Sequence, residues 1–128
     1  MLQLTAQSVV LVASISVDFR KGIDGLASVC KQSLAMDPFA GSLFLFYNRS
    51  RTTIKILFYD GQGFNLYIKR LSQGKFQHKI DINDNSPYQQ ICHRALQVLI
   101  NNGDLKSVKF SKDWRPIKTN QAAISPLP

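Results

Sequence analysis

Three apolar runs follow one another in the middle of the chain, and short stretches of turn residues separate them. The runs cover residues 43–47, 53–60 and 64–71. Each has the length of a strand and is rich in Ile, Leu, Phe and Tyr, which suit a pleated, half-buried surface. Between the second and third runs stands Asp60-Gly61-Gln62-Gly63, where the glycines can take the positive φ that a tight hairpin needs. The stretch therefore predicts a three-stranded antiparallel meander, around which the remaining elements must pack.

Side chains alternate between the two faces of a strand, so the sequence also predicts what each face of the meander carries. We expect the core face, packed under a helix, to carry Ile54, Ile56, Phe58, Phe64, Leu66 and Ile68. The opposite face is then predicted to carry Thr53, Lys55, Leu57, Tyr59, Asn65, Tyr67, Lys69 and Leu71. Cations mixed with rings are typical of a sheet that binds nucleic acid, because Lys and Arg neutralise phosphates while rings stack on bases. The alternative is a solvated face that borders a helix or a partner protein.

A strand and two amphipathic helices flank the meander. Residues 9–15 have the composition of a strand. Asp18 is a candidate N-cap for a first helix that ends before Asp37-Pro38, and the apolar stripe of this helix comprises Ile23, Leu26, Ala27, Cys30 and Leu34. A second helix is predicted to begin at Ser86-Pro87 and to end at Asn101, with a stripe of Tyr88, Ile91, Cys92, Ala95, Leu96 and Leu99.

The fold class that follows is α+β. We expect an antiparallel β-meander covered by an amphipathic helix, in the order β-α-β-β-β-α, and a short strand over residues 105–110 is an open addition. With 45% hydrophobic residues in 128, the chain can bury one core, so residues 1–117 are predicted to form a single domain. Residues 118–128 show no period and are predicted to form a loose C-terminal tail.

The charge balance points to a polyanionic partner. Sixteen Lys and Arg stand against eight acidic residues, all of them Asp, which gives a formal net charge of +8. A balance of this size most often indicates nucleic acid. The cations are spread along the sequence, so folding must assemble any binding patch; the candidate nucleic-acid contacts are Arg20, Lys21, Arg49, Arg51, Lys55, Tyr59, Tyr67, Lys69 and Arg70. Strict alternation places Arg70 on the core side unless the strand has already ended there.

Several other classes of protein are disfavoured. A run of about 18 apolar residues, as a membrane helix requires, is absent, and the N-terminus lacks the basic region of a secretory signal, so we expect a cytoplasmic protein. Cys30 and Cys92 both fall on predicted apolar stripes and are interpreted as buried free thiols. A zinc site built from them with His78 and His93 would lack the close-spaced cysteine pair that usually starts one, so we predict no metal and no cofactor.

No catalytic constellation stands out in the sequence, and we expect a protein that is not an enzyme. There is no nucleophile elbow, phosphate-binding glycine loop or metalloprotease helix. Asp18, Asp24 and Asp60 could be imagined as ligands of a Mg²⁺-dependent nuclease. A helix cap at Asp18 and a turn at Asp60 explain two of these carboxylates better.

Four segments of the sequence carry a family resemblance. They are DFRKGIDGL from Asp18, DPFAG from Asp37, KILFYDGQGF from Lys55 and KRL from Lys69. In order and spacing, from about residue 9 to residue 76, they resemble the TnpB-type accessory protein of the insertion sequence sixty-six family, the second open reading frame product of these bacterial transposable elements. The motif residues beside the cations are Asp18, Asp24, Asp60, Gly63 and Phe64. Tyr59 stands where the family usually has Trp, Ser72 stands where an acidic residue is common, and the match is weak after Phe76.

The resemblance implies a part in DNA transposition beside a separate transposase that carries the catalysis. Our leading hypothesis is a non-catalytic accessory protein that contacts DNA through a basic, aromatic sheet face and helps to assemble the transposase complex. A second hypothesis is an interaction module that docks on the transposase through exposed Tyr and Phe side chains without touching nucleic acid. The third hypothesis is the Mg²⁺-dependent nuclease.

Overall fold

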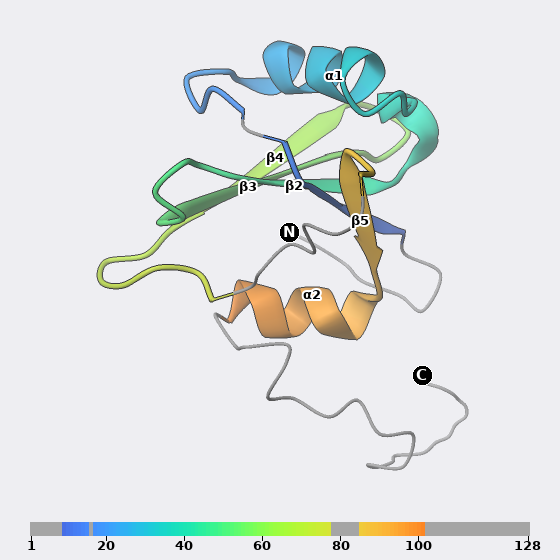
Figure 1. Cartoon of the computed structure of the whole chain (residues 1–128). Helices are drawn as coiled ribbons and strands as arrows, with labels where there is room; N and C mark the ends of the chain where they lie inside the picture. The colour runs from blue at the N-terminus through green and yellow to red at the C-terminus, as the bar shows by residue number, and fades with distance from the viewer. Residues whose placement is uncertain (1–8, 16, 78–84, 102–128) are drawn as a thin grey trace, which may run out of the picture.

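The structure is a computed structural model that describes residues 9–15, 17–77 and 85–101. Its centre is a five-stranded sheet in the order β4-β3-β2-β1-β5 (Figure 1). The strands are β1 (Val10–Ala13), β2 (Leu43–Tyr47), β3 (Thr53–Tyr59), β4 (Phe64–Arg70) and β5 (Tyr88–Ile91). β1 runs parallel to β2, and helix α1 (Ile23–Gln32) connects them, while all other neighbours are antiparallel. The α+β class and the meander of β2, β3 and β4 are confirmed.

The turn between β3 and β4 forms as predicted. Asp60 accepts hydrogen bonds from the backbone N–H groups of Gln62 and Gly63, at 2.9 and 3.0 Å, and from the side-chain amide of Asn65 at 2.9 Å. Gly61 has φ +97°, a conformation that favours glycine. Because these bonds stabilise the charged carboxylate, the pKa of Asp60 falls to about 2, with Asn65 as the largest cause.

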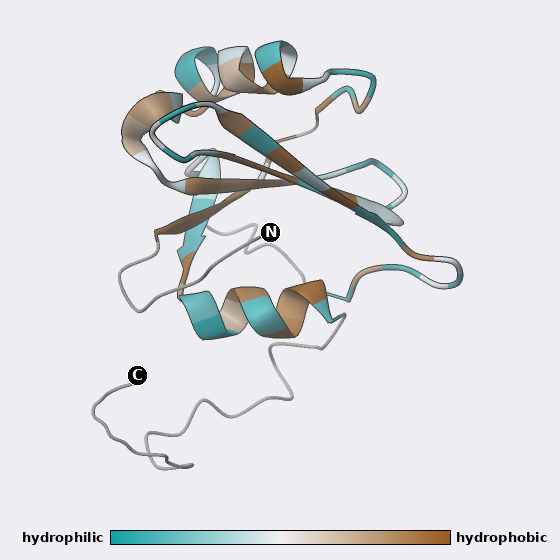
Figure 2. Cartoon of the chain, turned by 180° about the vertical axis from the view of Figure 1, so that it is seen from behind, coloured by the Kyte–Doolittle hydropathy of each residue, from teal (hydrophilic) through white to brown (hydrophobic). Residues whose placement is uncertain are grey.

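Helices cover both faces of the sheet, which gives three layers (Figures 1 and 2). On one face α1 packs through Leu26 and Cys30, and on the other helix α2 (His93–Ile100) packs through Leu96 and Leu99. The sheet side chains under α1 include Leu11, Phe44, Phe46 and Leu57, and those over α2 include Val10, Val12, Leu45, Ile54 and Ile56. A sheet buried on both faces explains why β2 is apolar at every position. Neither helix is long and apolar enough to cross a membrane.

The predicted faces of the meander are wrong. Tyr59 is paired with Phe64 across the turn, which places Lys55 opposite Ile68 and Ile54 opposite Lys69. The α1 side therefore carries Thr53, Lys55, Leu57 and Tyr59 with Phe64, Leu66, Ile68 and Arg70. The α2 side carries Ile54, Ile56 and Phe58 with Asn65, Tyr67 and Lys69. Four residues separate β3 from β4, so odd-numbered residues of β3 share a face with even-numbered residues of β4. The prediction was wrong because it placed the even-numbered residues of both strands on one face.

The predicted start of the second helix is also wrong. Tyr88–Ile91 forms β5, which pairs antiparallel with β1, and α2 begins only at His93. The backbone N–H and side-chain hydroxyl of Ser14 donate to the carbonyls of Pro87 and Ser86, at 2.9 and 2.8 Å. These bonds extend the ladder between two segments that are distant in the sequence, so local periodicity could not reveal the strand.

Two smaller predictions need correction. Asp18 does not cap α1, because Gly22 occupies the N-cap position without a side-chain bond. Cys92 is exposed and caps α2, where its sulfur accepts from the N–H of Ala95 at 3.4 Å, whereas Cys30 is buried as predicted. Burial raises the pKa of the Cys30 thiol to about 12. The candidate strand at 105–110, the tail at 118–128 and His78 lie outside the described residues.

Candidate nucleic-acid interface

Three of the predicted contact cations are held by the fold itself. The ammonium group of Lys55 donates to the carbonyls of Phe19 and Lys21, at 2.8 and 2.9 Å, and lies 5.0 Å from the centre of the Phe19 ring. On the other face Lys69 donates to the carbonyl of Ile100, at the C-terminal end of α2, at 2.7 Å. These bonds fix the loop before α1 and the end of α2 to the sheet.

Arg51 is the third engaged cation. It adopts φ +61° in the loop between β2 and β3, and its guanidinium carbon lies 4.2 Å from the centre of the Tyr47 ring, a cation–π distance. Tyr47 is itself buried in the α2-side core, and burial raises the pKa of its hydroxyl to about 12. The side chain of Arg51 therefore packs on the α2-side core at the β2–β3 loop, and it is only half-exposed.

Exposed cations gather at one end of the sheet, which we call the Arg70 end and define by Lys21, Arg49, Arg70 and Lys75. Their side chains are exposed, and none has a partner among the described residues. Three contacts bring their segments together. The bond from Lys55 holds the Lys21 backbone over β3, Thr53 pairs with Arg70, and the N–H of Phe76 donates to the carbonyl of Arg51 at 2.8 Å.

Arg20 lies beside Lys21 in the same loop but is paired. Its guanidinium contacts the Asp18 carboxylate at 2.7 Å, and its backbone N–H also donates to that carboxylate. The pair lowers the pKa of Asp18 and raises that of Arg20. Because the side chain of Arg20 remains 91% exposed, the ion pair is open to exchange for another anion.

The predicted rings lie away from these cations. Tyr59 packs with Phe39 and Phe64 into a cluster whose ring centres are 5.0 to 5.1 Å apart, which we call the ring cluster. It lies at the opposite end of the β3–β4 hairpin from Arg70, beside the Asp60 turn. Tyr67 is on the α2 side and packs against that core. The Arg70 end therefore carries exposed cations without the two predicted tyrosine rings beside them.

The three carboxylates considered for a nuclease are not assembled. Among the described residues, no group of three or more His, Cys, Asp or Glu side chains could hold a metal ion. Asp18 is paired with Arg20, Asp60 holds the hairpin turn, and Asp24 is exposed in the first turn of α1, where a negative charge favours the helix.

Sequence comparison agrees with the motif resemblance. Residues 8–110 match the family described as IS66 Orf2 like protein. The chain belongs to this family. Two similar proteins come from Sinorhizobium fredii (strain NBRC 101917 / NGR234): Uncharacterized protein y4jC, 36% identical over 67 residues, and Uncharacterized protein y4hO, 39% identical over 67 residues. Each match covers 52% of this chain, which spans 57% of the first relative and 58% of the second. No solved structure matches the chain.

The family motif residues mostly shape loops and turns of the fold. Asp18 shapes the loop before α1, Asp60 and Gly63 form the β3–β4 turn, and Phe64 joins the ring cluster. Sequence reasoning missed Lys75 as a member of the Arg70 end. Its position after the last meander strand was visible in the sequence, but its closeness to the β2–β3 loop depends on the bond between Phe76 and Arg51.

Proposed function

We propose that this protein is a non-catalytic accessory factor in DNA transposition that binds the phosphate backbone of DNA through the Arg70 end. Membership of the IS66 Orf2 like family supports the role in a transposable element. The observation that carries the DNA contact is the convergence of four exposed, unpaired cations from three separate segments. Exposed Lys and Arg side chains without an ion-pair partner can replace the counterions that are condensed on a DNA duplex.

Two of the four aspartates that the structure describes lie at the other end of the hairpin from Arg70. Asp37 caps the short 3₁₀ helix η1 (Pro38–Ala40), which holds Phe39, and Asp60 forms the neighbouring turn, so both lie beside the ring cluster. Of the remaining two, Asp18 beside Lys21 is neutralised by Arg20, and Asp24 lies in the first turn of α1. A duplex is therefore attracted to the Arg70 end and repelled from the other. Since the rings are remote from the cations, binding is expected to be weakly sequence-specific and to prefer duplex over single strands.

Fluorescence anisotropy tests this proposal directly. Labelled duplex DNA, single-stranded DNA and RNA are titrated with the full chain at two salt concentrations. We expect submicromolar, salt-sensitive binding that is tightest for the duplex. An absence of binding at low salt would remove DNA from the proposal.

Assembly with the transposase is the other half of the role. The transposase is expected to supply the catalytic groups, because the three aspartates considered for a nuclease, Asp60, Asp18 and Asp24, take part in a turn, an ion pair and a helix start. Disrupting this reading frame in a complete element should lower its transposition frequency, and supplying the protein in trans should restore it. An unchanged frequency would contradict an accessory role.

A second candidate function has its own supporting observation. Phe39 is 56% exposed although its ring packs against both Tyr59 and Phe64, and exposed aromatic groups are enriched where proteins dock. The protein could dock on the transposase through this cluster without contacting DNA. Replacing Phe39 with Ser should then abolish co-purification with the transposase at high salt, where electrostatic contacts are screened. Lys31→Gln, an exposed change on α1, serves as the control.

A further inference from the structure

Strand β4 is a long open edge of the sheet. The strand order places β4 and β5 at the two edges, and β4 is the longer, with seven residues against four. The N–H of Asp60 donates to the carbonyl of Gly63, and that of Leu71 to the carbonyl of Thr52. Hydrogen-bonded pairs alternate along an antiparallel ladder, so the odd positions of β4 bond to β3. The backbone N–H and C=O groups of Phe64, Leu66, Ile68 and Arg70 therefore point outward, and none has a partner among the described residues.

Most of the usual protections of an edge strand are missing from β4. The strand contains no proline, and its register with β3 runs through seven pairs without a bulge. The side chain of Ile68 is 54% exposed on the α1 side. The unpaired N–H and C=O groups of such an edge are a template to which another strand can add. The cations Lys69 and Arg70 occupy only its last two positions.

We propose that two copies of the protein pair through β4 in an antiparallel arrangement centred on Tyr67. The hydrogen-bonding positions then face each other, Phe64 with Arg70 of the second copy and Leu66 with Ile68 of the second copy. Four such pairs form on the order of eight backbone hydrogen bonds. The five-stranded sheets of the two copies become one continuous sheet, and the inference does not depend on DNA binding.

This register is complementary to itself along the whole strand. Leu66 against Ile68 covers the exposed side chain of Ile68, and Phe64 against Arg70 places a cation beside a ring. Lys69 faces Asn65, so no two like charges are opposed. The antiparallel direction also brings the basic end of each strand beside the Asp60 turn of the other copy. A slip by two residues would put Arg70 opposite Leu66 or beyond the end of the partner strand, which makes the centred register the best match.

The geometry has a consequence for the Arg70 end. An antiparallel pair of this kind has its two-fold axis perpendicular to the sheet, so α1 and the Arg70 ends of both copies lie on the same side. Arg70 lies six residue steps from Phe64, which at about 3.4 Å per step places the two Arg70 positions roughly 20 Å apart along the shared strand direction. The dimer would present the two Arg70 ends on one face, each beside the Asp60 turn of the other copy.

The test combines mass in solution with a cross-link that reports the register. Sedimentation of the full chain should give a species of twice 14.4 kDa. Ile68→Pro removes an outward N–H that β3 does not use, so it should yield a folded monomer with a nearly unchanged melting temperature. In a Cys92→Ser background, Tyr67→Cys should form an intermolecular disulfide, because a non-hydrogen-bonded pair brings Cα atoms to about 4.5 Å. Ser72→Cys, outside the strand, is the control that should not cross-link.

The outcomes divide clearly. Loss of the dimer in Ile68→Pro together with cross-linking of Tyr67→Cys supports the proposal. A wild-type chain that stays monomeric at high concentration overturns it, whether or not β4 pairs with another protein. A dimer that survives Ile68→Pro and leaves Tyr67→Cys uncross-linked overturns it as well, because another surface would then hold the copies together.

Discussion

Removing two charges from the Arg70 end should weaken DNA binding far more than the lost net charge alone accounts for. We consider the double variant Lys21→Gln, Arg70→Gln, which changes two exposed side chains without partners among the described residues. Each phosphate contact contributes about 0.9 to the slope of log affinity against log salt, so two contacts contribute about 1.8. The counterion contribution vanishes at about 1 M salt, so at about 0.1 M, one decade lower, a slope difference of about 1.8 corresponds to roughly 60-fold weaker binding of a duplex. Anisotropy titrations over a range of salt concentrations measure both quantities.

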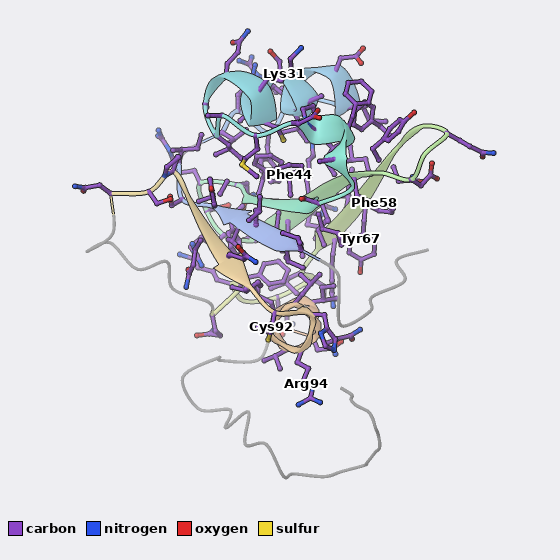
Figure 3. The ribbon with its side chains drawn as sticks, turned by 90° about the vertical axis from the view of Figure 1, so that its right-hand side faces the viewer. Lys31, Phe44, Phe58, Tyr67, Cys92 and Arg94 are labelled. Carbon is purple, nitrogen blue, oxygen red and sulfur yellow. The ribbon has the colours of Figure 1, made fainter. Side chains whose placement is uncertain are left out.

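The matched control is Lys31→Gln, Arg94→Gln, which also removes one Lys and one Arg. Lys31 lies in the last turn of α1 and Arg94 is exposed on α2, at opposite outer sides of the molecule (Figure 3). We expect this variant to keep a salt slope close to that of the wild type. Equal losses in the two double variants would show that only net charge matters. An unchanged slope in Lys21→Gln, Arg70→Gln would refute the interface itself, provided that both variants melt like the wild type.

Three further predictions concern the fold that positions the site. Lys69→Met should lower the free energy of unfolding by about 1 to 3 kcal/mol in denaturant titrations, because the carbonyl of Ile100 loses a charged donor; no change would show that this bond is not stabilising. The pKa of Asp60 is lowered in the folded state from 3.8 to about 2, so its contribution to stability is complete above pH 3.8 and lost as pH falls towards 2. Thermal melts of Asp60→Asn should lack that part of the acid destabilisation, and a profile identical to the wild type would contradict it. Native labelling with a thiol reagent, read by mass spectrometry, should modify the exposed Cys92 and spare Cys30, whose pKa burial raises to about 12; early modification of Cys30 would contradict its burial.

Elements defined by local signals could be predicted from the sequence. The three meander strands and the turn at Asp60 depend on strand propensity, glycine and a carboxylate that bonds its own turn, all within a few residues. The apolar period that places Leu26 and Cys30 on one face of α1 is equally local. Its two ends were misjudged: Asp18 bonds to Arg20 in the preceding loop instead of capping the helix, and Leu34 lies beyond the helix end at Gln32.

The candidate site shows where local reasoning stops. Exposure separates Arg70 from Lys69, although the two are adjacent and carry the same charge, because one side chain faces solvent and the other reaches the end of α2. The register that decides this could be derived from the four-residue turn once the strand ends are known. The hydrogen bond from Lys55 to the Phe19 carbonyl could not be derived from the sequence, because the two residues lie 36 positions apart in the chain.

By itself, the sequence determined the basic charge, the meander, the family and the residues from which an interface could be drawn. The tertiary structure alone decided which cations remain exposed, that helices cover both sheet faces, and that Tyr88–Ile91 is a strand. The physical reason is the range of the interactions. Propensity and turn bonds act between near neighbours in the chain, whereas the β1–β5 ladder and the bonds of Lys55 and Lys69 exist only after distant segments have packed together.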